Sequence, residues 1–114
     1  MNNKKTGNIG EDFAESYLKN KGHFVLERNF RTPFGEIDII TFFHNSIYIY
    51  EVKYRKNLEY GFGDDAITPQ KVNKIRKTFE VWISQNQKNY NFKNIYLNAL
   101  IIDPDGKINE FEVM

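Results

Sequence analysis

The amino-acid sequence predicts an α/β protein with a central mixed β-sheet flanked by helices, and its element pattern and length favour this class. Apolar residues recur at helical spacing in two stretches, and five shorter stretches are rich in the β-branched and aromatic residues typical of strands. They follow the order α-β-β-β-α-β-β. With 114 residues and 40% hydrophobic content, the chain can bury about two-thirds of its unfolded surface, so we expect positions 1–114 to form a single domain.

The first helix is expected to begin at Thr6 or Asn8, either of which can cap it, and to end near Lys21, followed by Gly22. Glu11 falls at the border of its apolar arc, so this carboxylate can face inward. The arc itself consists of Ile9, Phe13, Ala14, Tyr17 and Leu18.

The remaining elements are bounded by residues that favour turns and helix ends. Thr68 and Pro69 are typical of a helix cap and first helical position. We expect strands at 23–30, 35–43, 47–54, 95–102 and 107–113, a loop at 56–67 and the second helix at 68–85. The buried stripe of that helix is Val72, Ile75, Phe79, Trp82 and Ile83. His23 and His44, near a helix end and a turn, are expected to be surface residues and not ligands.

The two strands at 35–43 and 47–54 should form a hairpin with charged residues on one face. If its turn centres on His44 and Asn45, Asp38 lies opposite Glu51, and Glu36 lies opposite Lys53. On that face the apolar residues are Ile40, Phe42, Ile47 and Ile49, and on the other they are Ile37, Ile39, Tyr48, Tyr50 and Val52. Apolar residues on both faces predict a sheet covered on both sides, so the charged cluster would be partly buried and would need a compensating cation.

Two interpretations of this cluster remain open on spacing alone. Asp38 and Glu51 can be ligands of a metal ion, or Lys53 can form a structural ion pair with Glu51 or Glu36 at a sheet edge. A slip of the register by one residue would separate Asp38 from Glu51.

The distribution of charge is more informative than the total of +1. Positions 53–77 carry seven basic and three acidic residues, a net charge of +4 that leaves −3 for the remainder. A phosphate backbone would be neutralised by such a segment, although a solvated helix face explains it as well. Lys71 and Lys74 begin a helix, where cations oppose the macrodipole, so an anion bound there would be favourable; tolerated surface lysines are the alternative.

Several classes of protein are disfavoured by composition. The chain has no cysteine, so neither a disulfide framework nor a zinc–thiolate site is available. Positions 1–7 lack the apolar core of a signal peptide, and no apolar run is long enough for a membrane span. We expect a soluble, cytoplasmic protein that neither enters a membrane nor uses an organic cofactor.

Six blocks of residues, at matching order and spacing, resemble the YraN family of small bacterial proteins over about three-quarters of the chain. The blocks are Gly10-Glu11-x-x-Ala14 with Tyr17-Leu18, Lys21-Gly22, Arg28-Asn29-Phe30-Arg31, Gly35-Glu36-Ile37-Asp38, Glu51-Val52-Lys53-x-Arg55 and Ala66-Ile67-Thr68-x-x-Lys71. The resemblance implies the restriction endonuclease-like αβββαβ core of the PD-(D/E)xK nucleases, with archaeal Holliday junction resolvases among the closer relatives.

The same resemblance implies a catalytic set of Asp38, Glu51, Lys53 and Glu11. Asp38 matches the motif aspartate, although Ile37 replaces the preceding proline. Asp38, Glu51, Glu11 and the backbone carbonyl of Val52 would offer hard oxygen ligands to Mg²⁺ or Mn²⁺. Lys53 would stabilise the negative charge that develops on phosphorus, since a lysine with an ordinary pKa is a poor general base.

The function implied is a metal-dependent endonuclease that acts on DNA, branched DNA included, as a homodimer where a junction needs paired cuts. A noncatalytic DNA-binding or protein-interaction module on the same fold is the alternative. For Arg28, Arg31 and Arg55, packing on aromatic rings is the alternative to contacts with phosphate. The residues expected to contact nucleic acid are Arg28, Arg31, Arg55, Lys56, Lys71 and Lys74.

Overall fold

The computed structural model describes residues 2–55, 67–86 and 90–113, and its elements follow the predicted order. The elements are α1 (Asn2–Asn20), β1 (Phe24–Thr32), β2 (Gly35–Phe43), β3 (Ser46–Tyr54), α2 (Pro69–Asn86), β4 (Ile95–Ile102) and β5 (Ile108–Glu112). The loop expected at 56–67 lies almost entirely outside the described residues. In the part that is described, no helix is long and apolar enough to cross a membrane.

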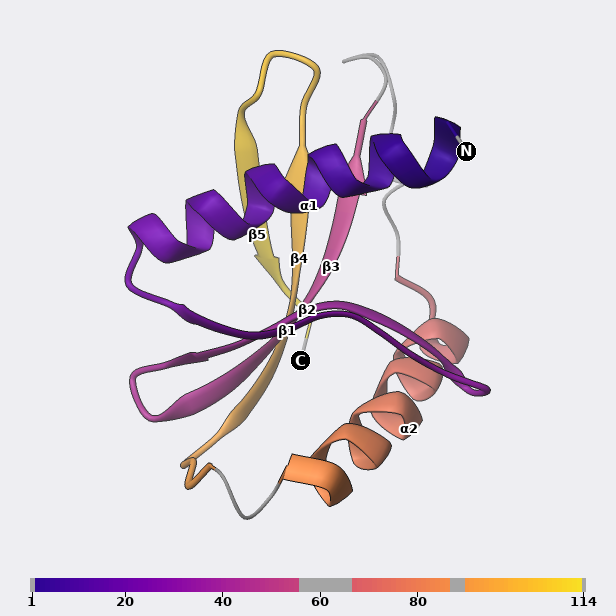
Figure 1. The fold of residues 1–114 in the computed structure, drawn as a ribbon, viewed down its shortest axis with the longest axis vertical. Helices are drawn as coiled ribbons and strands as arrows, with labels where there is room; N and C mark the ends of the chain where they lie inside the picture. The colour runs from indigo at the N-terminus through magenta and orange to yellow at the C-terminus, as the bar shows by residue number, and fades with distance from the viewer. Residues whose placement is uncertain (1, 56–66, 87–89, 114) are drawn as a thin grey trace.

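The five strands form one mixed sheet in the order β1-β2-β3-β4-β5. Neighbours are antiparallel except for β3 and β4, which are parallel and are connected through α2. As Figure 1 shows, α1 crosses one face of the sheet, whereas α2 packs mainly against β1 and β2. The predicted fold class is thereby confirmed, and the arrangement is compatible with a restriction endonuclease-like core.

A separate core covers each face of the sheet. The cluster on the α1 side is built around Ala14, Leu18, Ile39, Tyr50, Leu100 and Ile102. The cluster on the α2 side contains the predicted stripe of that helix, with Ile75, Phe79 and Trp82 buried against Ile37, Ile40, Ile47, Ile49 and Leu97. The prediction of a sheet covered on both sides is therefore correct.

The hairpin of β2 and β3 has the predicted register as far as Ile39, but the predicted pairs of Asp38 with Glu51 and of Glu36 with Lys53 lie beyond the paired residues. Its pairs run from Phe43 opposite Ser46 to Ile39 opposite Tyr50. His44 and Asn45 form the turn with φ values of 49° and 61°, and two positive values in succession define the type I′ turn that matches the twist of a hairpin.

Beyond Ile39, successive side chains of β2 no longer alternate regularly between the two faces of the sheet. As a result, the predicted face of Ile37 is wrong. Ile37 packs in the α2-side core, not on the α1 side with Ile39. The backbone pairing of β2 with β3 stops at Ile39, and on the adjoining strand β1 the residue Asn29 has a φ of 55°. A left-handed residue breaks the regular pleat, so the strand pair changes its facing next to Asp38.

Helix α1 begins earlier than predicted, at Asn2, but ends as expected. The N–H of Gly22 donates to the carbonyl of Lys19, and that of His23 donates to the carbonyl of Leu18. With Gly22 at φ 100°, these bonds make a Schellman ending. Phe13, expected in the apolar arc, is 48% exposed because the helix turns it away from the sheet.

Helix α2 starts as the sequence predicts. The hydroxyl of Thr68 accepts a hydrogen bond from the N–H of Lys71 at 3.2 Å, which satisfies one free donor of the first turn. The helix begins at Pro69 and continues to Asn86, one residue beyond the expected end.

His23 is buried, so its assignment as a surface residue was wrong. Its Nδ1 lies 2.7 Å from the hydroxyl of Thr41, and its ring stacks on Phe43 with centroids 4.1 Å apart. Burial lowers the pKa of His23 to about 4. The turn that ends α1 brings this side chain onto the sheet, whereas His44 is exposed as expected.

Candidate functional site

Three carboxylates from two elements meet at the end of the β2–β3 pairing. Glu11 on α1, with Glu36 and Asp38 on β2, each place one oxygen within 4.8 Å of the others, a geometry that can hold a metal ion. Glu11 is only 8% exposed, so the expectation that it faces inward is confirmed. We call these three residues the acidic cluster.

The carboxyl group of Asp38 lies at the centre of the negative charge. Burial, followed by the charge of Glu51, raises its pKa to about 7, and Glu11 and Glu36 act in the same direction. The N–H of Val52 opposes this shift by donating to Asp38 Oδ2 at 2.7 Å. This bond stands where the ladder between β2 and β3 ends, so the backbone of β3 fixes the orientation of the carboxyl group.

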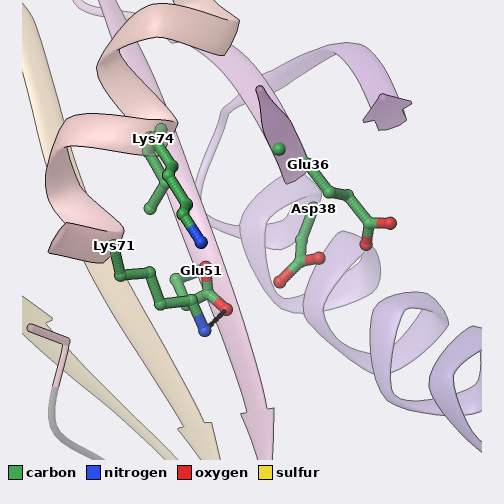
Figure 2. Close-up of a pocket in the computed structure, with 7 residues that line it drawn as sticks. Glu36, Asp38, Glu51, Lys71 and Lys74 are labelled. Atoms are coloured by element: carbon green, nitrogen blue, oxygen red, sulfur yellow. Dashed lines mark ion pairs between the residues drawn. The ribbon is translucent and has the colours of Figure 1, made fainter. Parts of the chain in front are cut away.

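A cavity of about 330 Å³ opens beside the acidic cluster, between β2, β3 and the first turns of α2. In Figure 2, Lys71 and Lys74 extend from α2 towards Glu51, and Asp38 and Glu36 lie across from them. The residues that line the cavity are Gly35, Glu36, Asp38, Glu51, Lys71, Lys74 and Ile75. Acidic and basic side chains thus face a space large enough to admit a ligand.

Glu51 is not one of the three residues of the acidic cluster, and its ion-pair partner is Lys71. The Nζ of Lys71 lies 2.8 Å from Glu51 Oε1, and the side chain of Glu51 is only 10% exposed. The structural alternative considered from the sequence was an ion pair with Lys53. Within the described part of the chain, the ion pair of Glu51 is instead made by a residue of α2.

Lys53 is partly buried next to the same charges. Burial lowers its pKa, the neighbouring ammonium of Lys71 lowers it further, and Glu51 and Asp38 oppose the change. For Lys71 burial also disfavours the charged form, but Glu51 more than compensates and the pKa is raised. The pKa of Lys53 is therefore lowered and that of Lys71 is raised, although the two lysines are neighbours.

The three arginines considered as phosphate contacts all have carboxylate partners. Arg28 Nη1 lies 2.8 Å from both Asp12 and Glu15, and its Nη2 lies 3.5 Å from Glu11. Arg31 pairs with Glu36, and Arg55 lies 3.6 Å from Asp103. Lys56 is outside the described residues. The cationic groups brought to the cavity are thus those of α2.

Two features of the site were missed from the sequence. Glu36 was placed on the charged face but not among the metal ligands, and its position directly before Ile37 and Asp38 in one block was the available signal. The pairing of Lys71 with Glu51 joins a helix to a strand, so no spacing along the chain indicates it.

The fold and site define a mixed α/β protein with a partly buried acidic cluster at a helix-lined cavity. Comparison with known proteins gives the family. Residues 10–102 match the model of the family described as Uncharacterised protein family UPF0102, and the chain belongs to this family, the YraN family.

Relatives in this family align over most or all of the chain. A UPF0102 protein of Dictyoglomus turgidum is 35% identical over 114 residues, covering 100% of this chain and 97% of the relative. One from Dictyoglomus thermophilum has the same identity and coverage. A UPF0102 protein of Clostridium botulinum is 49% identical over 81 residues, or 71% of this chain and 66% of the relative.

Proposed function

We propose that this protein is a divalent-metal-dependent endonuclease that hydrolyses phosphodiester bonds in DNA. The observation that carries the proposal is the environment of Asp38, whose partly buried carboxyl group lies among Glu11, Glu36 and Glu51. Carboxylates gathered out of water repel one another and favour a bound cation.

The acidic cluster fits Mg²⁺ or Mn²⁺. Its donors are hard carboxylate oxygens from Glu11, Glu36 and Asp38, and the adjoining cavity leaves room for water and a phosphate oxygen. When bound, such an ion supplies Lewis-acid polarisation of the phosphate and a water of lowered pKa.

The residues of the chain have separate roles in this proposal. Asp38 is oriented by the N–H of Val52, so it presents the same oxygen to the cluster without reorganisation. Lys53, close to Asp38 and Glu51, stabilises the negative charge that develops at phosphorus.

The DNA backbone is placed along the start of α2 in this proposal. Lys71 and Lys74 line the cavity and carry positive charge towards it. Phosphate contacts of this kind position a duplex without selecting its sequence. A four-way junction needs two cuts, so activity on branched DNA would use two copies of the chain.

The test is cleavage of labelled linear, flapped and four-way DNA with Mg²⁺ or Mn²⁺. Wild type is expected to cut, and Asp38→Asn and Lys53→Met are expected to lose at least about a hundredfold in rate. Asp105→Asn, in the exposed turn before β5, is the matched control for loss of a carboxylate and should cut normally. Absence of cutting by wild type on all three substrates with both metals contradicts the proposal.

A noncatalytic DNA-binding module is the second candidate, and one observation favours it. Lys71 already neutralises Glu51, and Arg28 lies beside Glu11, so internal cations compensate part of the acidic charge. This candidate predicts that wild type and Asp38→Asn bind DNA equally and that neither cuts. Fluorescence anisotropy on the same substrates measures the binding.

A further inference from the structure

Glu51 and Lys71 form the closest contact between an acid of the site and a cation of α2. Their separation is 2.8 Å, and the carboxylate side chain is 10% exposed while that of the lysine is 37% exposed. The acid is therefore fixed inside the fold, and the ammonium reaches it from the solvent side on a flexible stem. Of the two partners, Lys71 is the one that can leave.

The position of Lys71 in the helix does not favour a positive charge. It lies in the first turn of α2, where a cation opposes the helix macrodipole. The N–H of this residue is already satisfied by the hydroxyl of Thr68. The largest interaction that favours the ammonium is therefore its contact with Glu51, followed by a hydrogen bond with Lys53 and the charge of Asp38.

Lys74 provides a contrast one turn farther along α2. It lines the same cavity and points towards the same carboxylates in Figure 2. Among the described residues it makes no ion pair, and its side chain is exposed. The two lysines thus add similar charge to the cavity but differ in whether they occupy Glu51.

We propose that Lys71 is a positioning residue that exchanges partners: it is the counterion of Glu51 in the metal-free protein, and it transfers to a DNA phosphate when a divalent cation at the acidic cluster takes Glu51, which lines the same cavity as Asp38 and Glu36, as an additional ligand. This inference rests on the proposed function and assigns a new step to the same site. The metal ion replaces Lys71 as the counterion of Glu51, and this frees Lys71 to bind a phosphate. Binding of the metal by the site and binding of phosphate by Lys71 therefore favour each other.

The first experiment is calorimetric titration of the full chain with Mn²⁺ alone. Lys71→Met keeps the volume of the stem and removes the competing charge, so the affinity for Mn²⁺ should rise about tenfold. Lys74→Met is the matched control and should change the affinity by no more than about threefold, since it removes similar charge without freeing Glu51. Lys71→Arg retains the ion pair and should restore the wild-type affinity.

The second experiment measures DNA binding by anisotropy, using a duplex with phosphorothioate linkages that resist hydrolysis. Without metal, Lys71→Met should bind DNA within about twofold of wild type because Glu51 already holds this lysine. With Mn²⁺ present, the same substitution should weaken binding about fivefold or more. Lys74→Met should weaken binding by the same factor in both conditions.

The outcomes separate this inference from the proposed function. If neither wild type nor Lys71→Met binds Mn²⁺, the metal-dependent function and the exchange both fail. If wild type binds Mn²⁺ and Lys71→Met binds it with equal or lower affinity, only the exchange is overturned. Tighter binding by Lys71→Met with restoration by Lys71→Arg supports it, provided that thermal melts show both variants folded.

Discussion

The carboxyl group of Asp38 combines a structural hydrogen bond with an unfavourable electrostatic position. The bond from the N–H of Val52 stabilises its charged form, but burial and three neighbouring acids outweigh that bond and raise the pKa to about 7. In the metal-free protein at neutral pH, this residue costs stability. Strongly perturbed pKa values of this kind cluster at functional sites.

Asp38→Asn should therefore stabilise the metal-free protein above neutral pH. The pKa of Asp38 is raised from 3.8 to about 7, so the folded state binds this proton more tightly, and wild-type stability falls as pH rises from about 4 to about 7. An amide oxygen can still accept the bond from Val52. Urea unfolding at pH 8 should show a gain on the order of 2 kcal/mol.

That gain should shrink at pH 4, where the wild-type carboxyl group is protonated, and Mn²⁺ should stabilise wild type but not the variant. Asp105→Asn serves as the control at an exposed turn. An equal difference between Asp38→Asn and wild type at both pH values would contradict the electrostatic explanation.

His23 should act on stability in the opposite direction. Its pKa is lowered from 6.5 to about 4 by burial, so the folded state disfavours the proton, and stability is lost as pH falls from about 6.5 to 4. The loss should be on the order of 2–3 kcal/mol. NMR of the imidazole ring protons measures the pKa directly, and a midpoint above 6 would show that the ring is accessible to water.

At the scale of elements, the ends of helices and hairpins follow local chemistry. The Schellman ending of α1 requires Gly22 at φ 100°, and a Cβ there would lie 3.3 Å from Cε1 of Phe43. The turn before β5 contains Gly106 at φ 87°, but a Cβ there would meet nothing within 4 Å. The two glycines share a backbone requirement and differ in packing.

Gly22→Ala should consequently destabilise the protein more than Gly106→Ala. A left-handed alanine costs about 1 kcal/mol at either position, and displacement of Phe43 should add about 1 kcal/mol at the first. Chemical denaturation of both variants measures the difference. Equal losses would mean that Phe43 adjusts freely and that only the backbone matters.

The same local chemistry explains which elements the sequence predicts well. The hairpin register follows from a two-residue turn at His44 and Asn45, and the start of α2 follows from Thr68. Local patterns fail where tertiary contacts decide. Ile37 changes face because a left-handed Asn29 lies on the neighbouring strand, and an isolated sequence pattern gives no indication of that pairing.

In the candidate site too, some features follow from local sequence and others depend on tertiary contacts. Asp38 and Glu51 come near each other because the hairpin register is set locally, and Glu11 faces inward because of its place on the helical arc. The ion pair of Lys71 with Glu51 depends on how α2 packs on the sheet. The sequence pattern does not determine that packing, so the sequence could not predict the ion pair. The roles of these residues are implied by the family resemblance, whereas spacing alone left both a metal site and a structural ion pair open.

Across the whole molecule, the two cores share the sheet and should lose structure together. Leu18 is fully buried on the α1 side, and Trp82, the single tryptophan, is 1% exposed on the α2 side. Substitution on one face can therefore be detected by a fluorophore on the other. Such coupling is expected where one sheet forms the floor of both cores.

Leu18→Ala should lower the urea midpoint reported by Trp82 fluorescence, with a loss of about 3 kcal/mol in unfolding free energy. Circular dichroism should give the same midpoint as fluorescence. Ser16→Ala, on the exposed side of α1, is the control and should change stability little. Two separate transitions in Leu18→Ala would show that the faces unfold independently.

The carboxylates of the site and the two lysines that line the cavity lie on different segments of the chain. Glu11, Glu36, Asp38 and Glu51 all precede position 55, whereas Lys71 and Lys74 arrive on α2. Changes confined to one helix can accordingly reset the charge balance of the cavity while every carboxylate stays in place. The strand pairings that hold Glu36, Asp38 and Glu51 in place involve no residue of α2, so the sheet does not depend on the two lysines for its register.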